Sequence, residues 1–380
     1  MKLKTLSNTL SGLLACLMLA SCNSGNNISP KTFKTPVGWI YSTLFSQNAV
    51  MAIDNAQSRI QADPIPVSNG PISLATDPRG QQAYLYVVCQ VGNTVDVVDR
   101  RSSLRIRSIN VGEKPYGIAI SPDGLKAFVT NEDSDTVSVI DLNNRIVTQT
   151  IQLNILSNNA QPTQGQPAHL DPRGIATDWN GTHVYVACAN GHVIVLTAAN
   201  TSSAYTASGN VLLTGAVEPQ NIAVDSSQAE GPQETVYVTD PKGDNLFFFN
   251  GAQGNATAQQ RQISGSPWGV AVGVNPVSGA NDMLYVTASS GSALYSLKLP
   301  DLTSTSAQGG GVSVEGQNPT AVAVSPLGSE VYVALSGNNT VEVFQREGDQ
   351  LARPQQFDIS QLNPQYVSPT GGLAVGSYMF

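Results

Sequence analysis

One three-strand pattern recurs seven times along the chain and limits the possible folds more than any other feature. Its most regular copy is KPYGIAISPDGLKAFVTNEDSDTVSVID, residues 114–141. Helical spacing of apolar residues is weak throughout, so the pattern predicts an all-β protein made of short strands. The first strands are predicted at 73–77, 117–121, 174–178, 221–225, 269–273, 321–325 and 372–376, the second at 40–44, 84–89, 128–131, 184–188, 236–240, 284–288 and 331–335, and the third at 49–54, 94–99, 136–141, 192–197, 245–250, 293–298 and 340–345.

Turn chemistry links the first two strands of each copy. SPDG (121–124) and SPLG (325–328) place proline second, where its fixed φ suits a turn, and glycine last, where a positive φ costs nothing. A fourth strand follows, for example at 145–153. The resulting period of about 45–50 residues is typical of a four-stranded propeller blade.

The two ends of the repeat region each hold part of a blade. The chain begins the pattern with strands two to four and ends it with a lone first strand, GGLAVGSYMF. Pairing the two ends would complete one blade and leave no open sheet edge. We therefore predict a seven-bladed β-propeller over residues 37–380, in which residues 372–376 pair with residues 39–45.

An aromatic residue occupies the same place in every second strand. One ring at a fixed period indicates packing between stacked sheets, because a cofactor site would not need seven copies. The column consists of Tyr41, Tyr86, Phe128, Tyr185, Tyr237, Tyr285 and Tyr332.

The stretch SPDGLKAFVTNEDSDTVSVID, residues 121–141, resembles the YVTN family of β-propeller repeats. That family occurs in bacterial surface and periplasmic proteins and is related to lactonase-like propellers. The resemblance is strong over 111–153, weaker elsewhere, and covers nearly all of 37–380. It implies the propeller fold, and it does not specify a chemistry.

Residues 1–21 have the features of an export signal: Lys2 and Lys4 precede a short apolar run. The run ends in Leu-Ala-Ser-Cys, which resembles a bacterial lipobox and implies lipidation of Cys22. Residues 22–36 would then form a flexible tether to the membrane. Asn23 favours the outer membrane if the source is Gram-negative. A cleaved signal with a chance cysteine is the alternative.

Charge argues against nucleic acid as a partner. The chain carries a net charge of −8, and loss of the two leader lysines makes it −10. Such a field repels phosphates. The densest basic stretch, RRSSLRIR at 100–107, falls where an exposed outer strand is expected. We expect a monomer.

Beyond the lipobox cysteine the chain has two cysteines, Cys89 and Cys188, in the same column two blades apart. That separation exceeds disulfide reach, so both are predicted to be free and buried.

No catalytic, haem or metal motif is present, and no cofactor is predicted. The three histidines, His169, His183 and His192, fall at different places in one blade and should not converge on a metal. NEDSD, at 131–135, lacks a calcium-loop pattern and is interpreted as a solvated turn. The aspartates that follow three of the third strands are interpreted as turn residues: Asp54, Asp99 and Asp141.

The remaining candidates are side chains beside the proline that opens each first strand, where propeller loops converge on the central channel. They could bind a polar ligand or a protein partner, or merely cap the channel. The predicted ligand-binding residues are Glu113, Lys114, Tyr116, His169, Arg173, Glu218, Gln220 and Trp268.

Three functions fit these observations. The first is a non-enzymatic, lipid-anchored propeller that binds a partner at the cell envelope. The second is a lactonase-like hydrolase, with His169 or Glu218 as general base and Arg173 stabilising the oxyanion. The third is an accessory to a periplasmic redox system, although no cofactor ligand is visible.

Overall fold

A computed structural model describes residues 38–79, 84–153, 169–226, 234–251, 256–304, 311–352, 355–359 and 369–375. The predicted export signal, Cys22 and the tether to residue 36 lie outside these residues. Clustering of contacts separates Pro36–Phe380 from Met1–Thr35 as one compact unit. Nothing helical in the described part of the chain is long and apolar enough to cross a membrane.

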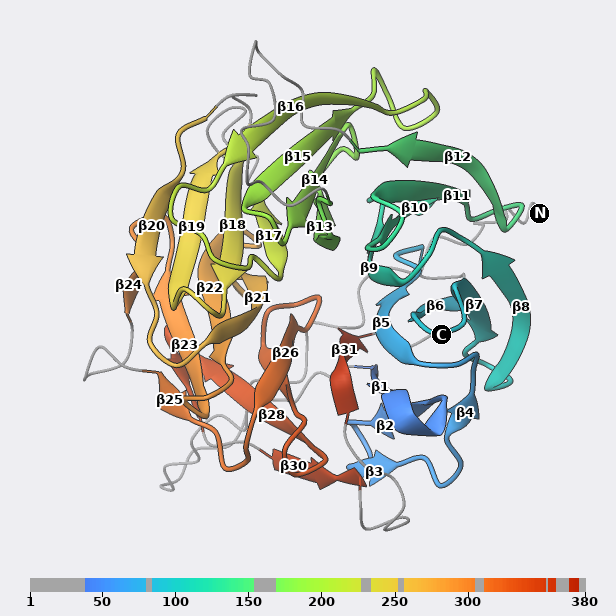
Figure 1. The fold of residues 1–380 in the computed structure, drawn as a ribbon. Helices are drawn as coiled ribbons and strands as arrows, with labels where there is room; N and C mark the ends of the chain where they lie inside the picture. Colours follow the sequence, from blue (N-terminus) through green and yellow to red (C-terminus); the bar gives the residue numbers. More distant parts are fainter. Residues whose placement is uncertain are drawn as a thin grey trace, which may run out of the picture. The chain divides into compact units, whose positions relative to one another are not determined.

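Seven antiparallel sheets follow one another round a ring within this unit (Figure 1). Each predicted first strand overlaps the innermost strand of a sheet, and neighbouring innermost strands contact one another all the way round. Seven innermost strands therefore surround the centre of the ring. They are β5 (Pro71–Thr76), β9 (Pro115–Ile120), β13 (Pro172–Thr177), β17 (Ile222–Asp225), β21 (Pro267–Val274), β26 (Pro319–Val324) and β31 (Pro369–Val375).

The predicted second and third strands also overlap observed strands. The second strands are β6 (Tyr84–Cys89), β10 (Lys126–Asn131), β14 (His183–Cys188), β18 (Thr235–Asp240), β22 (Asn281–Ala288), β27 (Glu330–Leu335) and β1 (Trp39–Leu44). The third strands are β7 (Thr94–Asp99), β11 (Thr136–Asp141), β15 (His192–Thr197), β19 (Asn245–Asn250), β23 (Ala293–Lys298), β28 (Thr340–Glu347) and β2 (Ala49–Asp54).

The outermost strands face solvent on one side, and three of the seven are split into two short pieces. In the first four blades they are β8 (Leu104–Asn110), β12 (Ile146–Gln152), β16 (Thr206–Leu212) and β20 (Gln259–Gln262). In the other three blades the pieces are β24 (Thr303–Ser304) and β25 (Val312–Ser313), β29 (Gln350–Leu351) and β30 (Gln355–Asp358), and β3 (Arg59–Ile60) and β4 (Ile65–Pro66). A short 3-10 turn, η1 (Phe45–Gln47), lies between β1 and β2.

We number the blades from the N-terminus as β5–β8, β9–β12, β13–β16, β17–β20, β21–β25 and β26–β30. The closing blade joins β31 to β1–β4. Within it Ile40 pairs with Val375 and Ser42 pairs with Leu373. The predicted closure of the ring by both ends of the chain is confirmed.

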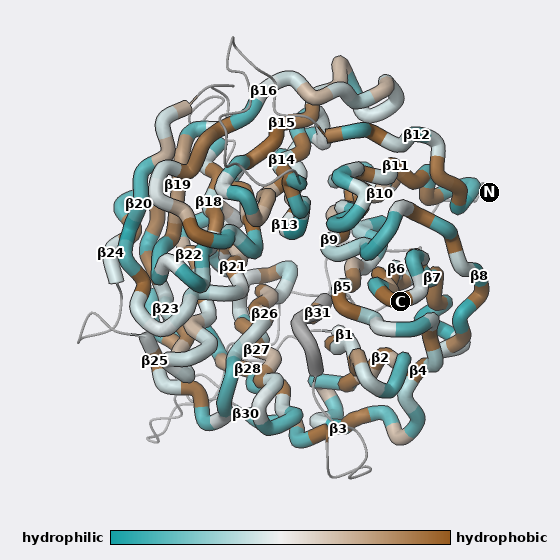
Figure 2. The backbone as a smooth tube through the Cα atoms, in the orientation of Figure 1, coloured by the Kyte–Doolittle hydropathy of each residue, from teal (hydrophilic) through white to brown (hydrophobic). Residues whose placement is uncertain are grey.

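The core lies between adjacent blades and is made mainly by the second and third strands. Figure 2 shows this as hydrophobic segments along β14 and β15 and hydrophilic segments along the outer β20. Each ring of the aromatic column is buried, as predicted, and Phe128 packs with Val184 and Val186 of the next blade. Fully burying one such side chain contributes about 2 kcal/mol.

A recurring hydrogen bond joins each of several blades to the next, and we call it the inter-blade latch. An Asn or Asp in the left-handed conformation precedes a third strand, which these two residue types tolerate better than other non-glycine residues. Its side-chain oxygen accepts the N–H of the residue before the proline of the next blade. The pairs are Asn48 with Gly70 (2.9 Å), Asn93 with Lys114 (2.9 Å), Asp135 with Asp171 (3.1 Å) and Asp244 with Ser266 (2.7 Å).

The interpretation of NEDSD as a solvated turn is confirmed in part: residues 132–135 form a turn and Asp133 is exposed, but the other residues of the segment are buried or half-buried. Asn131 and Glu132 are buried, and Asp135 forms the latch to the third blade while also accepting the N–H of Leu170 at 2.9 Å. Glu132 and Asp135 face the neighbouring blade, where their carboxylates accept from Arg173 and from backbone N–H groups. Sequence spacing within one repeat could not show this contact.

Four further structural predictions are confirmed. Cys89 and Cys188 are buried free thiols. Residues 104–107 lie on an exposed outer strand. The turn aspartates accept N–H groups two or three residues further on: Asp54, Asp99 and Asp141. Gly124 closes its hairpin with a φ of +69°.

Candidate functional site

Most innermost strands begin at a proline, and the residue after that proline lies at the beginning of the strand. Tyr116 and Arg173 are the second residues of β9 and β13, and Gln220 follows Pro219 just before β17. These three strands are consecutive round the ring, and β9 and β17 both contact β13. Their opening ends therefore place one functional side chain from each of three blades together.

Arg173 is the centre of this site. Its Nε donates to Glu132 Oε1 at 3.0 Å, and its Nη1 donates to Glu218 Oε1 at 2.7 Å and to Gln220 Oε1 at 2.6 Å. Its guanidinium carbon lies 5.9 Å from the centre of the Tyr116 ring. Because the side chain is only 16% exposed, these contacts hold a charge that is largely removed from water.

Further cations pair with the same carboxylates. Lys114 Nζ lies 3.1 Å from Glu132 Oε2, and Lys242 Nζ pairs with Glu218 Oε2. The result is an alternating sequence of charges across three blades, which we call the mouth network: Lys114, Glu132, Arg173, Glu218 and Lys242. Each carboxylate lies between two cations.

Electrostatics follow from this alternation. Partial burial would raise the pKa of Glu218, but hydrogen bonds from Lys242 and Arg173 outweigh it and hold the pKa below its usual value. Hydrogen bonding to Glu132 is the main reason that the pKa of Lys114 is raised. The charged state of both groups is thus stabilised, which makes Glu218 a weak proton acceptor.

The polar atoms of Tyr116 and Gln220 complete the network. Gln220 Nε2 donates to the Tyr116 hydroxyl, while its Oε1 accepts from Arg173. Burial is the main reason that the pKa of Tyr116 is raised, so the phenol is neutral. The two side chains offer donors and acceptors beside an aromatic face, a combination that suits a polar ligand.

The structure therefore brings together five of the eight predicted residues: Lys114, Tyr116, Arg173, Glu218 and Gln220. The others stand apart from the network. Glu113 is exposed, and His169 pairs with Asp135 at 3.0 Å. Trp268 is half-buried, and its backbone oxygen accepts from Asn221 and Thr239.

Sequence reasoning missed Glu132 and Lys242. Both follow second strands, and second strands end at the same end of the blade at which first strands begin. This shared end could have indicated that the two residues lie near the predicted site. Glu132 lies inside NEDSD, where the repeat pattern favoured a turn, so its burial at 4% exposure was not expected.

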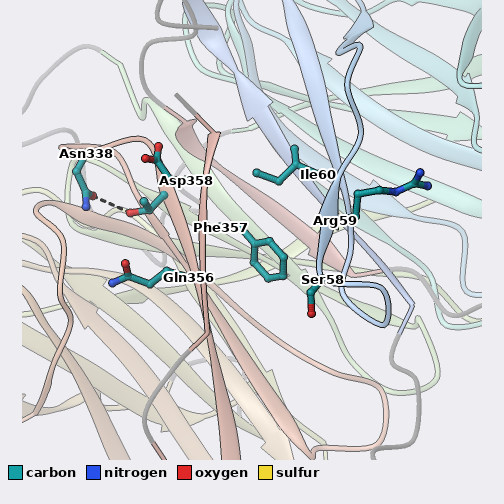
Figure 3. A pocket seen from close by; sticks show the side chains of 8 residues that line it. Ser58, Arg59, Ile60, Asn338, Gln356, Phe357 and Asp358 are labelled. Carbon is teal, nitrogen blue, oxygen red and sulfur yellow. Dashed lines mark hydrogen bonds between the residues drawn. The ribbon is translucent and has the colours of Figure 1, made fainter. Parts of the chain in front are cut away.

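A cavity of about 740 Å³ lies elsewhere, between the outer parts of the sixth and closing blades. Ile60 and Phe357 at its wall belong to the apolar core between those blades. Figure 3 shows the Arg59 side chain pointing away from Gln356 and Phe357. This cavity has no convergent set of charged side chains comparable with the mouth network.

No family model matches the sequence, and no curated protein matches it either. Solved structures do resemble the fold. The periplasmic gluconolactonase of Pseudomonas aeruginosa is 17% identical with a TM-score of 0.65, covering 90% of this chain and 99% of that one.

Two further solved structures are similar. Hydrazine synthase of Kuenenia stuttgartiensis is 19% identical with a TM-score of 0.63, covering 80% of this chain and 92% of that one. A putative 6-phosphogluconolactonase of Bacteroides uniformis is 13% identical with a TM-score of 0.66, covering 90% and 99%. At such identities the likeness shows the fold alone. The chain is a seven-bladed β-propeller with lactonases among its structural neighbours.

Proposed function

We propose that this chain is a non-enzymatic binding module that holds a polar ligand or partner at the mouth network. The observation that carries the proposal is Arg173, whose guanidinium joins Glu132, Glu218 and Gln220 from neighbouring blades. Rigid strand ends fix the donors and acceptors, so a ligand meets a preorganised surface. Half-buried Tyr116 adds an aromatic face beside Arg173.

The ligand class follows from the charges. The mouth network holds three cations and two carboxylates, each engaged by an opposite charge. A multiply charged ligand would have to displace these pairs, at a desolvation cost. A hydroxyl-rich or amide-rich ligand can hydrogen-bond to the edges of the network without breaking it. Carbohydrates and polar peptide segments have that chemistry.

Lactone hydrolysis is the second candidate, favoured by the likeness to a gluconolactonase. The chemistry at the mouth supports it less. Glu218 is held in its charged form by two cations, and Arg173 is already neutralised by two carboxylates. A hydrolase would need a proton acceptor and an uncommitted positive group near one reacting carbon.

The cellular setting in this proposal is the bacterial cell envelope. It rests on the resemblance to YVTN repeats and on the lipobox ending in Cys22. A lipid anchor at Cys22, followed by a polar tether, would hold the propeller at a membrane surface, with the outer membrane favoured by Asn23 in a Gram-negative source. Metabolic labelling with palmitate should mark the wild-type chain and leave Cys22→Ser unlabelled, and labelling of both would exclude this anchor.

A thermal-shift screen of sugars, envelope fragments and lactones tests the binding function. A ligand of the mouth should raise the Tm of the wild-type chain and of Arg79→Met, but not of Arg173→Met. Arg79 is a matched control because it also pairs with a carboxylate, Asp77, at 2.7 Å, near the opposite end of its blade. Equal shifts in both variants would exclude the mouth, and turnover of a lactone that is lost in Arg173→Met would favour the hydrolase.

A further inference from the structure

A second polar cluster lies at the far end of the third and fourth blades from the mouth network. Asp178 follows the last residue of β13, whereas Arg173 is near its beginning. His183 opens β14, and Glu234 directly precedes β18 of the next blade. The nitrogen of the histidine and one oxygen of each carboxylate lie within 4.8 Å of one another.

The contacts within the cluster set the orientation of these groups. His183 Nδ1 lies 3.0 Å from Asp178 Oδ2 and 3.9 Å from Glu234 Oε1. The Tyr185 hydroxyl donates to Glu234 Oε2 at 2.6 Å, and the Thr182 hydroxyl donates to Asp178 Oδ2 at 3.0 Å. Neighbouring side chains thus hold one oxygen of each carboxylate, which directs the carboxyl groups toward the histidine.

The unsatisfied atom is Asp178 Oδ1. Asp178 is 0% exposed, and this oxygen has no hydrogen-bond partner among the residues that the structure describes. The Asp178 carboxyl also faces that of Glu234, which is itself 7% exposed. Two facing, buried carboxylates with an unpartnered oxygen require a proton or a cation between them, because buried charge is otherwise paired or bound to metal.

We propose that Asp178, His183 and Glu234 bind a divalent transition-metal ion, for which Zn²⁺ is the first probe. One imidazole nitrogen and two carboxylate oxygens form a donor set that Zn²⁺ accepts. Ca²⁺ instead takes six to eight oxygen ligands, so a three-residue set with a nitrogen disfavours it. His183 is 34% exposed, which leaves a side from which an ion can enter and where water can complete the coordination.

Tyr185 would support the site without touching the ion. Its hydroxyl orients the Glu234 carboxylate, and its ring stacks with His183 at 6.2 Å between centroids. Partners of this kind change metal affinity by about 10–100-fold when removed. Tyr185→Phe should therefore weaken Zn²⁺ binding by at least about tenfold while the three ligands remain.

The competing explanation is a self-sufficient ion-paired cluster in which a protonated His183 neutralises the carboxylates. The two explanations differ in whether the chain takes up one equivalent of metal. The chain has only three histidines, and the other two lie outside the cluster. His169→Gln and His192→Gln are therefore matched controls for His183→Gln.

The experiment uses the full-length, tag-free chain stripped with a chelator. Calorimetric titration with Zn²⁺ should show one tight site, and Co²⁺ should give visible absorption. His183→Gln and Glu234→Gln should weaken both at least about tenfold, while His169→Gln and His192→Gln should leave them unchanged. Absence of stoichiometric uptake by the wild type would overturn the proposal. Undiminished uptake by folded His183→Gln and Glu234→Gln would also overturn it.

A second measurement uses only the wild-type chain, so it does not depend on whether the variants fold. Diethylpyrocarbonate modifies accessible imidazoles, and peptide mass spectrometry locates the modified histidine. Zn²⁺ should protect His183 and leave His169, whose side chain is 64% exposed, reactive. Equal modification of His183 with and without Zn²⁺ would contradict the metal site.

Discussion

The Nε of Arg173 lies 3.0 Å from Oε1 of Glu132, although 41 residues separate the two along the chain. The contact joins the residue that follows the second strand of one blade to the first strand of the next. It belongs to the packing of the ring as much as to the candidate site. The same residues can therefore be probed through both stability and binding.

Replacing Arg173 by methionine should lower the free energy of unfolding by about 3 kcal/mol, because Glu132 would remain buried with Lys114 as its remaining cation. Denaturant unfolding of the wild type, Arg173→Met, Glu132→Gln and the double variant measures this cost. The double variant should lose less than the sum of the two single losses. Additive losses would show that the pair contributes no coupling.

The stability of the folded chain should decrease at acidic pH, in part because Glu218 becomes protonated. Its folded-state pKa is lower than its usual value of 4.5, so its contribution is complete above that value and is lost as pH falls through the lower folded pKa. In Glu218→Gln the Tm between pH 5 and pH 3 should decrease less steeply. A slope identical to that of the wild type would assign the acid sensitivity to other carboxyl groups.

The inter-blade latch at Asp135 should depend on the acceptor oxygen and not on the charge. Asp135→Asn keeps an oxygen and matches Asn48 and Asn93 in other blades, so it should be nearly neutral. Asp135→Ala leaves the N–H groups of Leu170 and Asp171 without this acceptor and forces alanine to a φ of 50°, at a cost of about 2–3 kcal/mol. Chemical denaturation separates these outcomes, and equal losses in both variants would show that the charge matters.

The two propeller cysteines should resist alkylation in the folded state. Burial raises the pKa of the Cys89 thiol to about 12, and it raises that of Cys188 as well. Iodoacetamide without reductant should label both only after denaturation, as followed by peptide mass spectrometry. Labelling of either cysteine in the native chain would indicate opening of its blade, and failure to label both in denaturant would indicate a disulfide.

Loss of the closing strand should open the ring. Leu373 packs on the core between the sixth and closing blades, so Leu373→Asp should lower the Tm and increase proteolysis near β1. A chain cut before residue 369 should behave in the same way, and a synthetic peptide of residues 366–380 should restore part of the lost stability. Unchanged stability of the truncated chain would argue against closure by β31.

The fold could be predicted from the sequence because every repeat has the same order of strands and turns. The position of Phe128 is supported by six equivalent tyrosines, so an error in one repeat is corrected by the others. The pairing of β1 with β31 followed from two incomplete ends. These inferences depend on periodicity and on strand alternation, which are local properties of the chain.

The candidate site was only partly predictable, because its contacts lie between repeats. Alignment placed Arg173 and Tyr116 in one column, yet it could not show that Glu132 turns toward the neighbouring blade. His183 illustrates the same limit. From the sequence, His183 could be considered only together with the other two histidines. The structure places it beside two carboxylates, one of them from the fourth blade.

The closing blade also sets an order of events during biosynthesis. Six blades can pair their own strands as they leave the ribosome, but β1 finds its inner partner only when β31 has been made. Until then the chain carries an unpaired strand edge at its beginning. Completion of the circle therefore waits until β31 has been synthesised, and a nascent chain stalled before β31 would keep that edge unpaired.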